Sequence, residues 1–367
     1  MGRIRQILKK MFMEAFHRFP PFTDSNFRLE DAKNVLFVLS YKRIGDLVVF
    51  SFFPREFKRF FPDKELCVAI EGNYAEILEG NPFCRVVVIP TGFFRWLAFL
   101  RKEKFDVIID FPGGVGHNRQ IAYYFSGAKA VVLEETSEYH YPYARYVKTD
   151  LFNHITSSYK KILLLFANDL NRQAIEQKTD LSYRVEKYDY RSKKHSSVKP
   201  LLVINPEGHT DVKTLSCDKV ASIARCIVNN TDCSIDILAY KKKYNPSDSE
   251  RIRYVYLNNF DDLFRSVYEA DYVLTVDTAS MHIAEMYGRP MTSLHKVILP
   301  ENAEIDENSV PKCGKFISKD ICDQCAMCQW YPRKKADILI GRNSQEYISD
   351  DRITRSVIDG MSKNGII

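Results

Sequence analysis

Two segments in opposite halves of the chain share one pattern: NVLFVLSYKRIGD at residues 34–46 and DYVLTVDTASMHI at residues 271–283. Each begins with an apolar, β-branched run typical of a buried parallel strand, and each then enters a short polar turn that carries an aspartate. An expected helix follows. Ligands of open α/β sheets bind where the carboxyl ends of strands meet helix N-termini. One such turn in each half predicts a binding cleft between two nucleotide-binding-like domains.

The same alternation of strand and helix runs through most of the chain. The spacing predicts strands at 34–39, 66–70, 85–90, 105–111, 130–134, 201–206, 234–240, 254–257, 272–276 and 291–295. Helical runs of about ten to fifteen residues separate them, which favours right-handed βαβ units and parallel sheets. The predicted fold class is therefore α/β, with two Rossmann-like, doubly wound domains. Their expected bounds are 34–190 and 191–345, after an N-terminal extension at 1–33 and before a C-terminal helix at 346–367 that braces the first domain.

Composition narrows the class of protein. The chain has 367 residues, of which 45% are hydrophobic and 27% charged, as in an ordinary globular protein. It has neither an apolar run long enough to span a membrane nor a secretory signal, so we expect a cytoplasmic protein with mostly reduced cysteines. It also lacks a basic groove or a known nucleic-acid-binding module, which argues against nucleic acid as a partner.

The N-terminus is basic and amphipathic. Residues 1–20 carry five Lys or Arg side chains against Glu14 alone, interleaved with apolar residues at roughly helical spacing. Such a helix can lie on an anionic membrane surface. The alternative is a helix that packs on the body of the protein or on a partner chain.

The first polar turn contains Arg43, Gly45 and Asp46. Gly45 allows a close or left-handed backbone turn. A carboxylate at Asp46 is suited to accept a proton from a substrate hydroxyl, although an aspartate here can equally be a helix N-cap.

The second polar turn presents two hydroxyls and successive backbone N–H groups at a helix start. This arrangement suits a diphosphate, while capping by Asp277 or Thr278 is the alternative. His282 lies further along the same helix and faces either a ligand or the strand behind it. A third turn, after the strand at 201–206, holds a lysine suited to meet phosphate. The candidate ligand-binding residues of these two turns are Asn205, Glu207, Gly208, Lys213, Asp277, Thr278, Ala279, Ser280 and His282.

These motifs carry a resemblance to a known family. RIGD after the first strand, NP-x-G with a downstream lysine, and D-T-x-x-x-H near the end resemble glycosyltransferase family 9, the heptosyltransferases of bacterial lipopolysaccharide core assembly. The resemblance covers residues 34 to about 295 in motif order and spacing. It implies a GT-B fold, with the acceptor bound mainly by the first domain and the nucleotide sugar by the second.

The resemblance also implies a mechanism and roles for residues. The reaction is metal-independent inversion at the anomeric carbon, with ADP-heptose as the first donor to consider and a lipid-linked cell-surface glycan as acceptor. Asp46 matches the base that deprotonates the acceptor hydroxyl. Lys213 matches the contact to the donor diphosphate, and Asp277 the residue that holds the donor sugar. The backbone amides of 278–280 bind the diphosphate, and Ala279 stands where the family commonly has glycine.

Four cysteines cluster near the C-terminal end of the second domain: Cys313, Cys322, Cys325 and Cys328. Four thiols suit a tetrahedral Zn or Fe site. Their spacing differs from two separated Cys-x2-Cys pairs, so reduced or redox-labile thiols are the alternative. Catalysis does not require a metal in either case.

Two other functions remain open from the sequence. One is a non-catalytic protein of the same fold that binds a nucleotide sugar or serves as a scaffold. The other is a sugar-nucleotide epimerase of GT-B fold, for which Glu207 and His282 are the acid/base candidates.

Overall fold

The computed structural model describes residues 26–39, 43–112, 116–135, 144–148, 155–190, 199–209, 213–240, 249–297, 336–342 and 349–367. These residues divide into two compact units. The first contains residues up to 39, 52–148 and 155–181, and the second contains 43–51 and the residues from 182 onward. The sequence expectation differs in placing 43–51 and 182–190 in the first domain.

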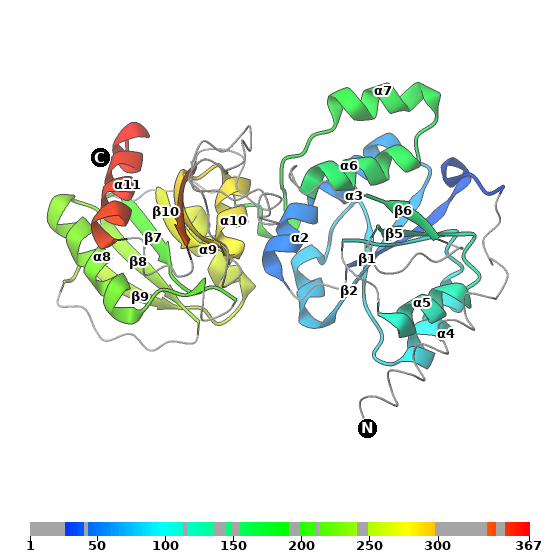
Figure 1. The fold of residues 1–367 in the computed structure, drawn as a ribbon, viewed down its shortest axis with the longest axis horizontal. Helices are drawn as coiled ribbons and strands as arrows, with labels where there is room; N and C mark the ends of the chain where they lie inside the picture. Colours follow the sequence, from blue (N-terminus) through cyan, green and yellow to red (C-terminus); the bar gives the residue numbers. More distant parts are fainter. Residues whose placement is uncertain are drawn as a thin grey trace. The chain divides into compact units, whose positions relative to one another are not determined.

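Each unit is built on one six-stranded parallel sheet (Figure 1). The strand order is β3-β2-β1-β4-β5-β6 in the first unit and β9-β8-β7-β10-β11-β12 in the second, which is the same winding. The fold is therefore α/β with two doubly wound parallel sheets, as predicted. The strands are β1 (Asn34–Leu39), β2 (Glu65–Ile70), β3 (Arg85–Val88), β4 (Val107–Asp110), β5 (Ala130–Glu134), β6 (Ala144–Val147), β7 (Leu201–Asn205), β8 (Ser234–Ala239), β9 (Ile252–Tyr256), β10 (Tyr272–Val276), β11 (Met291–Val297) and β12 (Ala336–Arg342).

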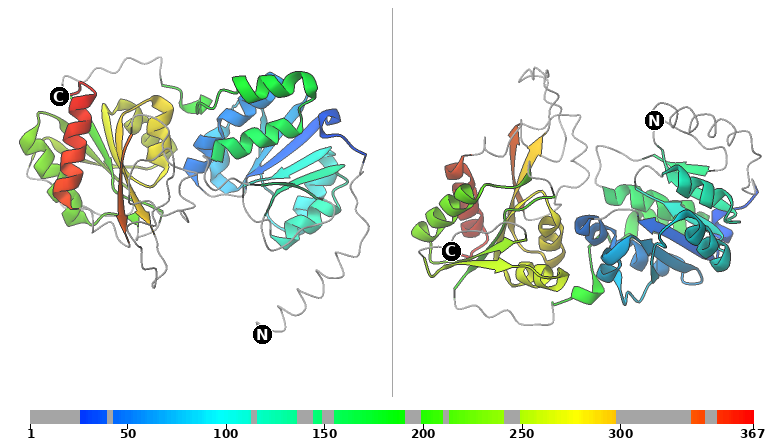
Figure 2. Two further views of the ribbon diagram at one scale, coloured as in Figure 1. Left: turned by 45° about the horizontal axis from the view of Figure 1, so that its top comes forward. Right: turned by 90° about the horizontal axis from the view of Figure 1, so that it is seen from below.

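Helices cover both faces of the first sheet (Figure 2). Side chains of α4 (Phe93–Glu103) and α5 (His117–Tyr124) pack with Leu36 and Val38 of β1 on one face. On the other face Phe37 meets Phe53 of α3 (Phe52–Phe60) and Tyr159 of α6 (Ile155–Leu165). Successive residues of β1 thus enter opposite cores, as the period of a strand requires. The short 3-10 helices η1 (Leu29–Asp31) and η2 (Gly72–Leu78) complete the unit.

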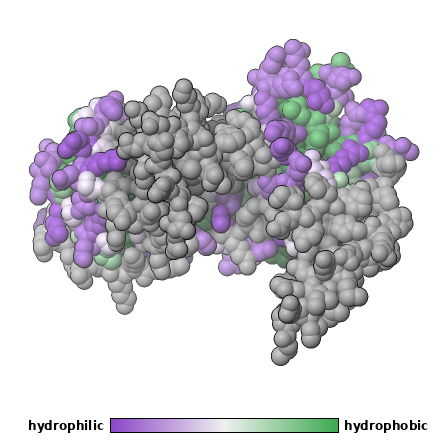
Figure 3. All heavy atoms as spheres, in the orientation of Figure 1, coloured by the Kyte–Doolittle hydropathy of each residue, from purple (hydrophilic) through white to green (hydrophobic). Residues whose placement is uncertain are grey.

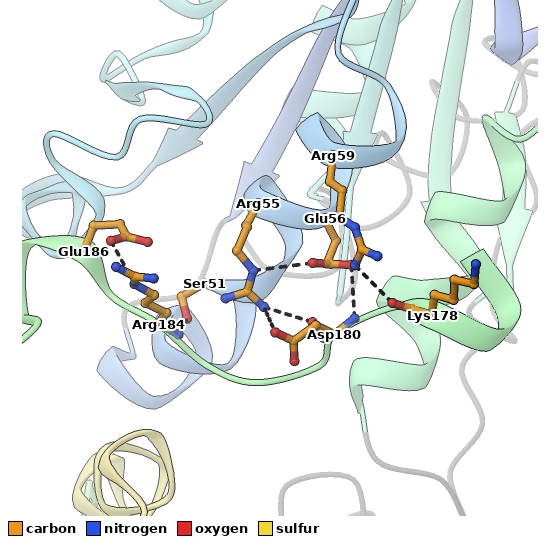
Figure 4. A network of polar contacts seen from close by, with 8 residues as sticks. All are labelled: Ser51, Arg55, Glu56, Arg59, Lys178, Asp180, Arg184 and Glu186. Carbon is orange, nitrogen blue, oxygen red and sulfur yellow. Dashed lines mark hydrogen bonds and ion pairs between the residues drawn. The ribbon is translucent and has the colours of Figure 1, made fainter. Parts of the chain in front are cut away.

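The end of α7 (Asp169–Lys178) is tied to α3 by a polar network around Glu56, whose side chain is 1% exposed (Figure 4). Its carboxylate accepts from Arg59 at 3.0 Å and from the backbone N–H of Asp180 at 3.0 Å. Arg55 donates to Asp180 at 3.1 Å. Hydrophobic side chains also gather on the surface beside α6 and α7 (Figure 3). Leu170 of α7 is 91% exposed.

The second sheet is likewise covered on both faces. The helices α8 (Cys217–Asn230) and α11 (Asp350–Lys363) share one hydrophobic core with strands β7, β8 and β10. The helices α9 (Phe260–Glu269) and α10 (Ala279–Tyr287) pack on the other side. The C-terminal helix therefore places its buried Ile353, Val357 and Met361 in the second unit, whereas the sequence expectation had it bracing the first domain.

A segment that follows the first unit in sequence also belongs to the second. We call residues 182–190, which include the 3-10 helix η3 (Glu186–Tyr188), the strap. Helix α2 (Ile44–Phe50) follows β1 in the chain but packs on α10. Among the described residues, none of the helices is long and apolar enough to cross a membrane.

Candidate active site

Hydrogen bonds hold the turn after β7 together and also join it to Ser280. Asn205 Nδ2 donates to Ser280 Oγ at 2.5 Å, and both side chains are buried. The Gly208 N–H donates to Thr214 Oγ1 at 3.0 Å. A Cβ placed on Gly208 would lie 2.6 Å from the Cβ of Lys213, so only glycine lets the two ends of the turn approach. The turn is thereby fixed against the start of α10.

The same turn brings Lys213 to Asp277, and the Lys213 ammonium donates to Asp277 Oδ2 in an ion pair. Both side chains stay partly exposed, at 31% and 17%. The pair is neutral overall, and it holds the Lys213 ammonium next to the N-terminus of α10, whose partial positive charge would stabilise an anionic ligand.

Helix α10 begins at Ala279, with Thr278 in the N-cap position. The Thr278 side chain makes no capping hydrogen bond, and Ser280 is engaged by Asn205. The first N–H groups of an α-helix have no partner within the helix. Of the two capping candidates, Asp277 and Thr278, Thr278 therefore occupies the N-cap position, but its side chain does not cap the helix.

Helix α2 carries Gly45 and Asp46. It begins at Ile44, its N-cap is Arg43, and Asp46 is its third residue. Asp46 is thus not the N-cap, which removes the structural alternative for this carboxylate. Gly45 is helical rather than left-handed, and a Cβ at this position would lie 2.9 Å from His282 Cδ2. The glycine therefore serves close helix packing.

The Asp46 side chain is 7% exposed. Its Oδ2 atom has no hydrogen-bond partner in the part of the chain that the structure describes. Burial raises the pKa of Asp46 from 3.8 to about 7; Arg43 opposes the shift and the Asp277 carboxylate adds to it. A carboxyl group with such a pKa is half ionised near neutral pH, as a general base needs to be.

His282 is 5% exposed and contacts two segments. Its ring lies against Gly45, and its centroid is 6.3 Å from that of Tyr183 in an edge-to-face arrangement. Glu207 is also buried and accepts from the backbone N–H of Tyr240 at 3.1 Å.

The second unit thus contains every described candidate: Arg43, Gly45, Asp46, Asn205, Glu207, Gly208, Lys213, Asp277, Thr278, Ala279, Ser280 and His282. The sequence assigned the first three to the other domain. The cysteines 313, 322, 325 and 328 lie outside the described residues, as do the basic residues of the N-terminus. Within the described ranges, no group of His, Cys, Asp and Glu side chains is arranged to hold a metal ion.

Asp110 and Tyr183 are two buried side chains with polar or aromatic contacts that the sequence did not single out. Asp110 ends β4, is 1% exposed, accepts from Tyr123 at 2.5 Å and lies 3.6 Å from Arg119. It precedes the glycine-rich PGGVG run, and that position at a strand end was the available signal. Tyr183 stands in a segment with no regular periodicity, so its contact with His282 had no sequence signal.

Comparison with known proteins decides the family. The sequence model of glycosyltransferase family 9 (heptosyltransferase) matches residues 94–304, which is more than half of the chain. The chain belongs to glycosyltransferase family 9. This family 9 enzyme is thus a glycosyltransferase, as its sequence motifs predicted. No curated protein matches it by sequence.

Solved structures agree on the fold of the family 9 enzyme. It is similar to E. coli ADP-heptose lps heptosyltransferase II, with a TM-score of 0.63 at 14% identity over 91% of this chain and 99% of that one. A family 9 glycosyltransferase from Veillonella parvula gives a TM-score of 0.63 at 12% identity, covering 92% and 100%. E. coli heptosyltransferase WaaC with ADP gives 0.61 at 12%, covering 89% and 99%. The fold is therefore GT-B.

Proposed function

We propose that this family 9 enzyme is an inverting, metal-independent glycosyltransferase in which Asp46 is the general base. The observation that carries the proposal is the Asp46 carboxyl group, which is buried, has a pKa of about 7 and lies within the electrostatic reach of Asp277. Membership of the family supports transfer of a sugar from a nucleotide donor.

The chemistry follows from these groups. Ionised Asp46 takes the proton of the acceptor hydroxyl as its oxygen attacks the anomeric carbon of the donor. The bond from that carbon to the diphosphate oxygen breaks, and the nucleoside diphosphate leaves with the bonding electrons. The N-terminus of α10 and the Lys213 ammonium stabilise the charge on the leaving group. When the donor binds, Lys213 exchanges its Asp277 partner for the diphosphate, which frees the Asp277 carboxylate to hold hydroxyls of the sugar before transfer begins.

We propose ADP-heptose as the first donor and a lipopolysaccharide-type, lipid-linked glycan as the acceptor. Two of the similar structures are described as E. coli WaaC with ADP and with ADP-2-deoxy-2-fluoro heptose, the latter at a TM-score of 0.57. For such an acceptor the enzyme would work in the cytoplasm, at the inner face of the plasma membrane, with residues 1–20 as its membrane contact.

Donor binding is tested by thermal unfolding in the presence of ADP-, UDP-, GDP- and CMP-sugars at millimolar concentration. One donor class should raise the melting temperature, because a ligand that binds only the folded state stabilises it. No shift with any of them would contradict the donor site.

The base is tested with Asp46→Asn, which should abolish transfer and keep the donor-induced shift in melting temperature. The matched control is Asp236→Asn, because Asp236 is equally buried at 7% but pairs with Arg253 on neighbouring strands. Turnover retained in Asp46→Asn would remove Asp46 as the base. If a donor raises the melting temperature but no sugar is transferred to any glycan, the protein binds a nucleotide sugar without catalysing transfer.

A further inference from the structure

The strap connects the two helices that carry the candidate active site. On the α10 side, the Tyr183 ring meets His282, and the Val185 N–H donates to Met286 Sδ at 3.4 Å. Tyr287 of α10 donates to the Tyr188 carbonyl at 2.5 Å. Three successive points of α10 are therefore held by one extended segment.

The strap also holds the end of α2. Ser51 follows α2, is 2% exposed, and its hydroxyl donates to the Val48 carbonyl at 2.6 Å. The same oxygen accepts from the Arg184 N–H at 2.8 Å (Figure 4). Ser51 thus joins the C-terminal turn of α2 to the residue directly after Tyr183. The side chain of Arg184 pairs separately with Glu186 and Asp189 within the strap.

Further along, the strap is anchored in the second unit by aromatic contacts. Tyr188 stacks on Phe264 of α9 with ring centroids 4.3 Å apart, and Tyr190 donates to Asp261. The strap is therefore also held by α9, so its position does not depend on α2 or α10 alone.

We propose that Tyr183 and Ser51 are positioning residues, through which the strap sets helix α2, and with it Asp46, against the donor turn of α10. Tyr183 fixes the imidazole of His282, Gly45 packs on that imidazole without a side chain of its own, and Asp46 is the next residue. The inference rests on the proposed role of Asp46 as base. Neither Tyr183 nor Ser51 touches a reacting atom in it.

The pKa of Asp46 can be measured separately from the reaction rate, and it reports on the position of α2. Burial is the main cause of its raised pKa, with Arg43 lowering it and Asp277 raising it, and His282 is the titratable group of α10 that packs on the adjacent Gly45. A shift of α2 that admits water reduces the desolvation of the carboxylate, so its titration midpoint falls.

The test compares Tyr183→Leu with Tyr183→Phe, and Ser51→Ala with Ser266→Ala. Phenylalanine keeps the aromatic ring. Ser266 is a matched control, because its hydroxyl also donates to a backbone carbonyl in a helix, that of Asp262, away from the strap. Two quantities are measured: kcat and KM with ADP-heptose as the probe donor, and the Asp46 titration, seen as the infrared carboxyl band absent from Asp46→Asn.

Tyr183→Leu and Ser51→Ala should lower kcat about 10- to 100-fold, since misplacement by about 1 Å can cost that much, with KM for the donor nearly unchanged. The Asp46 midpoint should fall in both variants and stay in Tyr183→Phe and Ser266→Ala. An unchanged midpoint in Tyr183→Leu and Ser51→Ala overturns the positioning role, whatever the rate. A shifted midpoint with unchanged kcat keeps the positioning role and contradicts Asp46 as base, which separates the two failures.

Discussion

Among single residues, Asp46 combines burial with the proposed role of general base. Because only the ionised form of the proposed base can accept the proton of the acceptor, kcat/KM should rise with pH through a midpoint near 7. Asp277→Asn should move that midpoint down, since it removes a nearby negative charge. Arg43→Gln should move it up, since it removes a positive one. Initial rates across pH 5–9 measure both shifts, and a profile that does not respond to either substitution would exclude Asp46 as the titrating group.

The same burial links stability to pH. In the unfolded chain Asp46 titrates near 3.8, and in the folded protein near 7, so the folded state holds the proton more tightly. The stability from this group is complete below pH 3.8 and is lost as pH rises through 7. Asp46→Asn cannot ionise. Its free energy of unfolding relative to the natural protein should therefore increase by roughly 2–3 kcal/mol between pH 5 and pH 8, measured by urea denaturation. An equal difference at both pH values would contradict the raised pKa.

Among elements, the contact between α7 and α3 depends on one buried carboxylate. Glu56→Ala removes a buried carboxylate that accepts from Arg55, from Arg59 and from the Asp180 N–H, so the free energy of unfolding should fall by about 2–4 kcal/mol. Arg59→Ala removes a side chain that is 47% exposed and should cost about 1 kcal/mol or less. Denaturant unfolding of both variants gives the comparison. Equal losses would mean that the network contributes no more than a surface ion pair.

The charge of the expected N-terminal helix predicts that it binds anionic membranes. Deleting residues 1–20 removes five basic side chains and one acidic one, so binding to vesicles of anionic lipid should weaken, and more strongly at low salt. Sedimentation with vesicles measures the bound fraction, with vesicles of neutral lipid as control. An unchanged fraction would favour a helix that packs on protein.

How far the sequence predicts the elements depends on their burial. Strands β1 and β10 are unbroken apolar runs and were predicted within a residue of their bounds. Of the strands at sheet edges, β3 and β9 were predicted, whereas β6 and β12 were missed. The sequence of β6, ARYV, is short and has no apolar run to mark it. Residues 155–178 form two helices rather than one continuous helix, since Asn168 caps α7 by accepting from the Asn171 N–H.

In the whole molecule, the proposed chemistry requires no metal ion, because the helix terminus and Lys213 balance the charge of the leaving group. Transfer should therefore continue at an unchanged rate after exhaustive treatment with EDTA. Metal analysis of the purified protein tests the four clustered cysteines separately. Loss of transfer on chelation, restored by adding back a divalent cation, would contradict the metal-independent mechanism.

The arrangement of the candidate site was only partly predictable at this scale. The three polar turns follow strands β1, β7 and β10, and local sequence identifies each of them. That α2 belongs with α10 depends on Gly45 meeting His282, a contact between distant parts of the chain that no local pattern encodes. The contact of Tyr183 with His282, on which its proposed positioning role rests, was hidden for the same reason.

The two sheets have the same strand order, but one helix of the second unit, α2, is synthesised together with the first unit. Helix α2 leaves the ribosome with the first half of the chain, but α10, on which it packs, is translated more than 200 residues later. Until then α2 cannot make its contacts with α10. The proposed base therefore gains the neighbours that α10 supplies only near the end of translation.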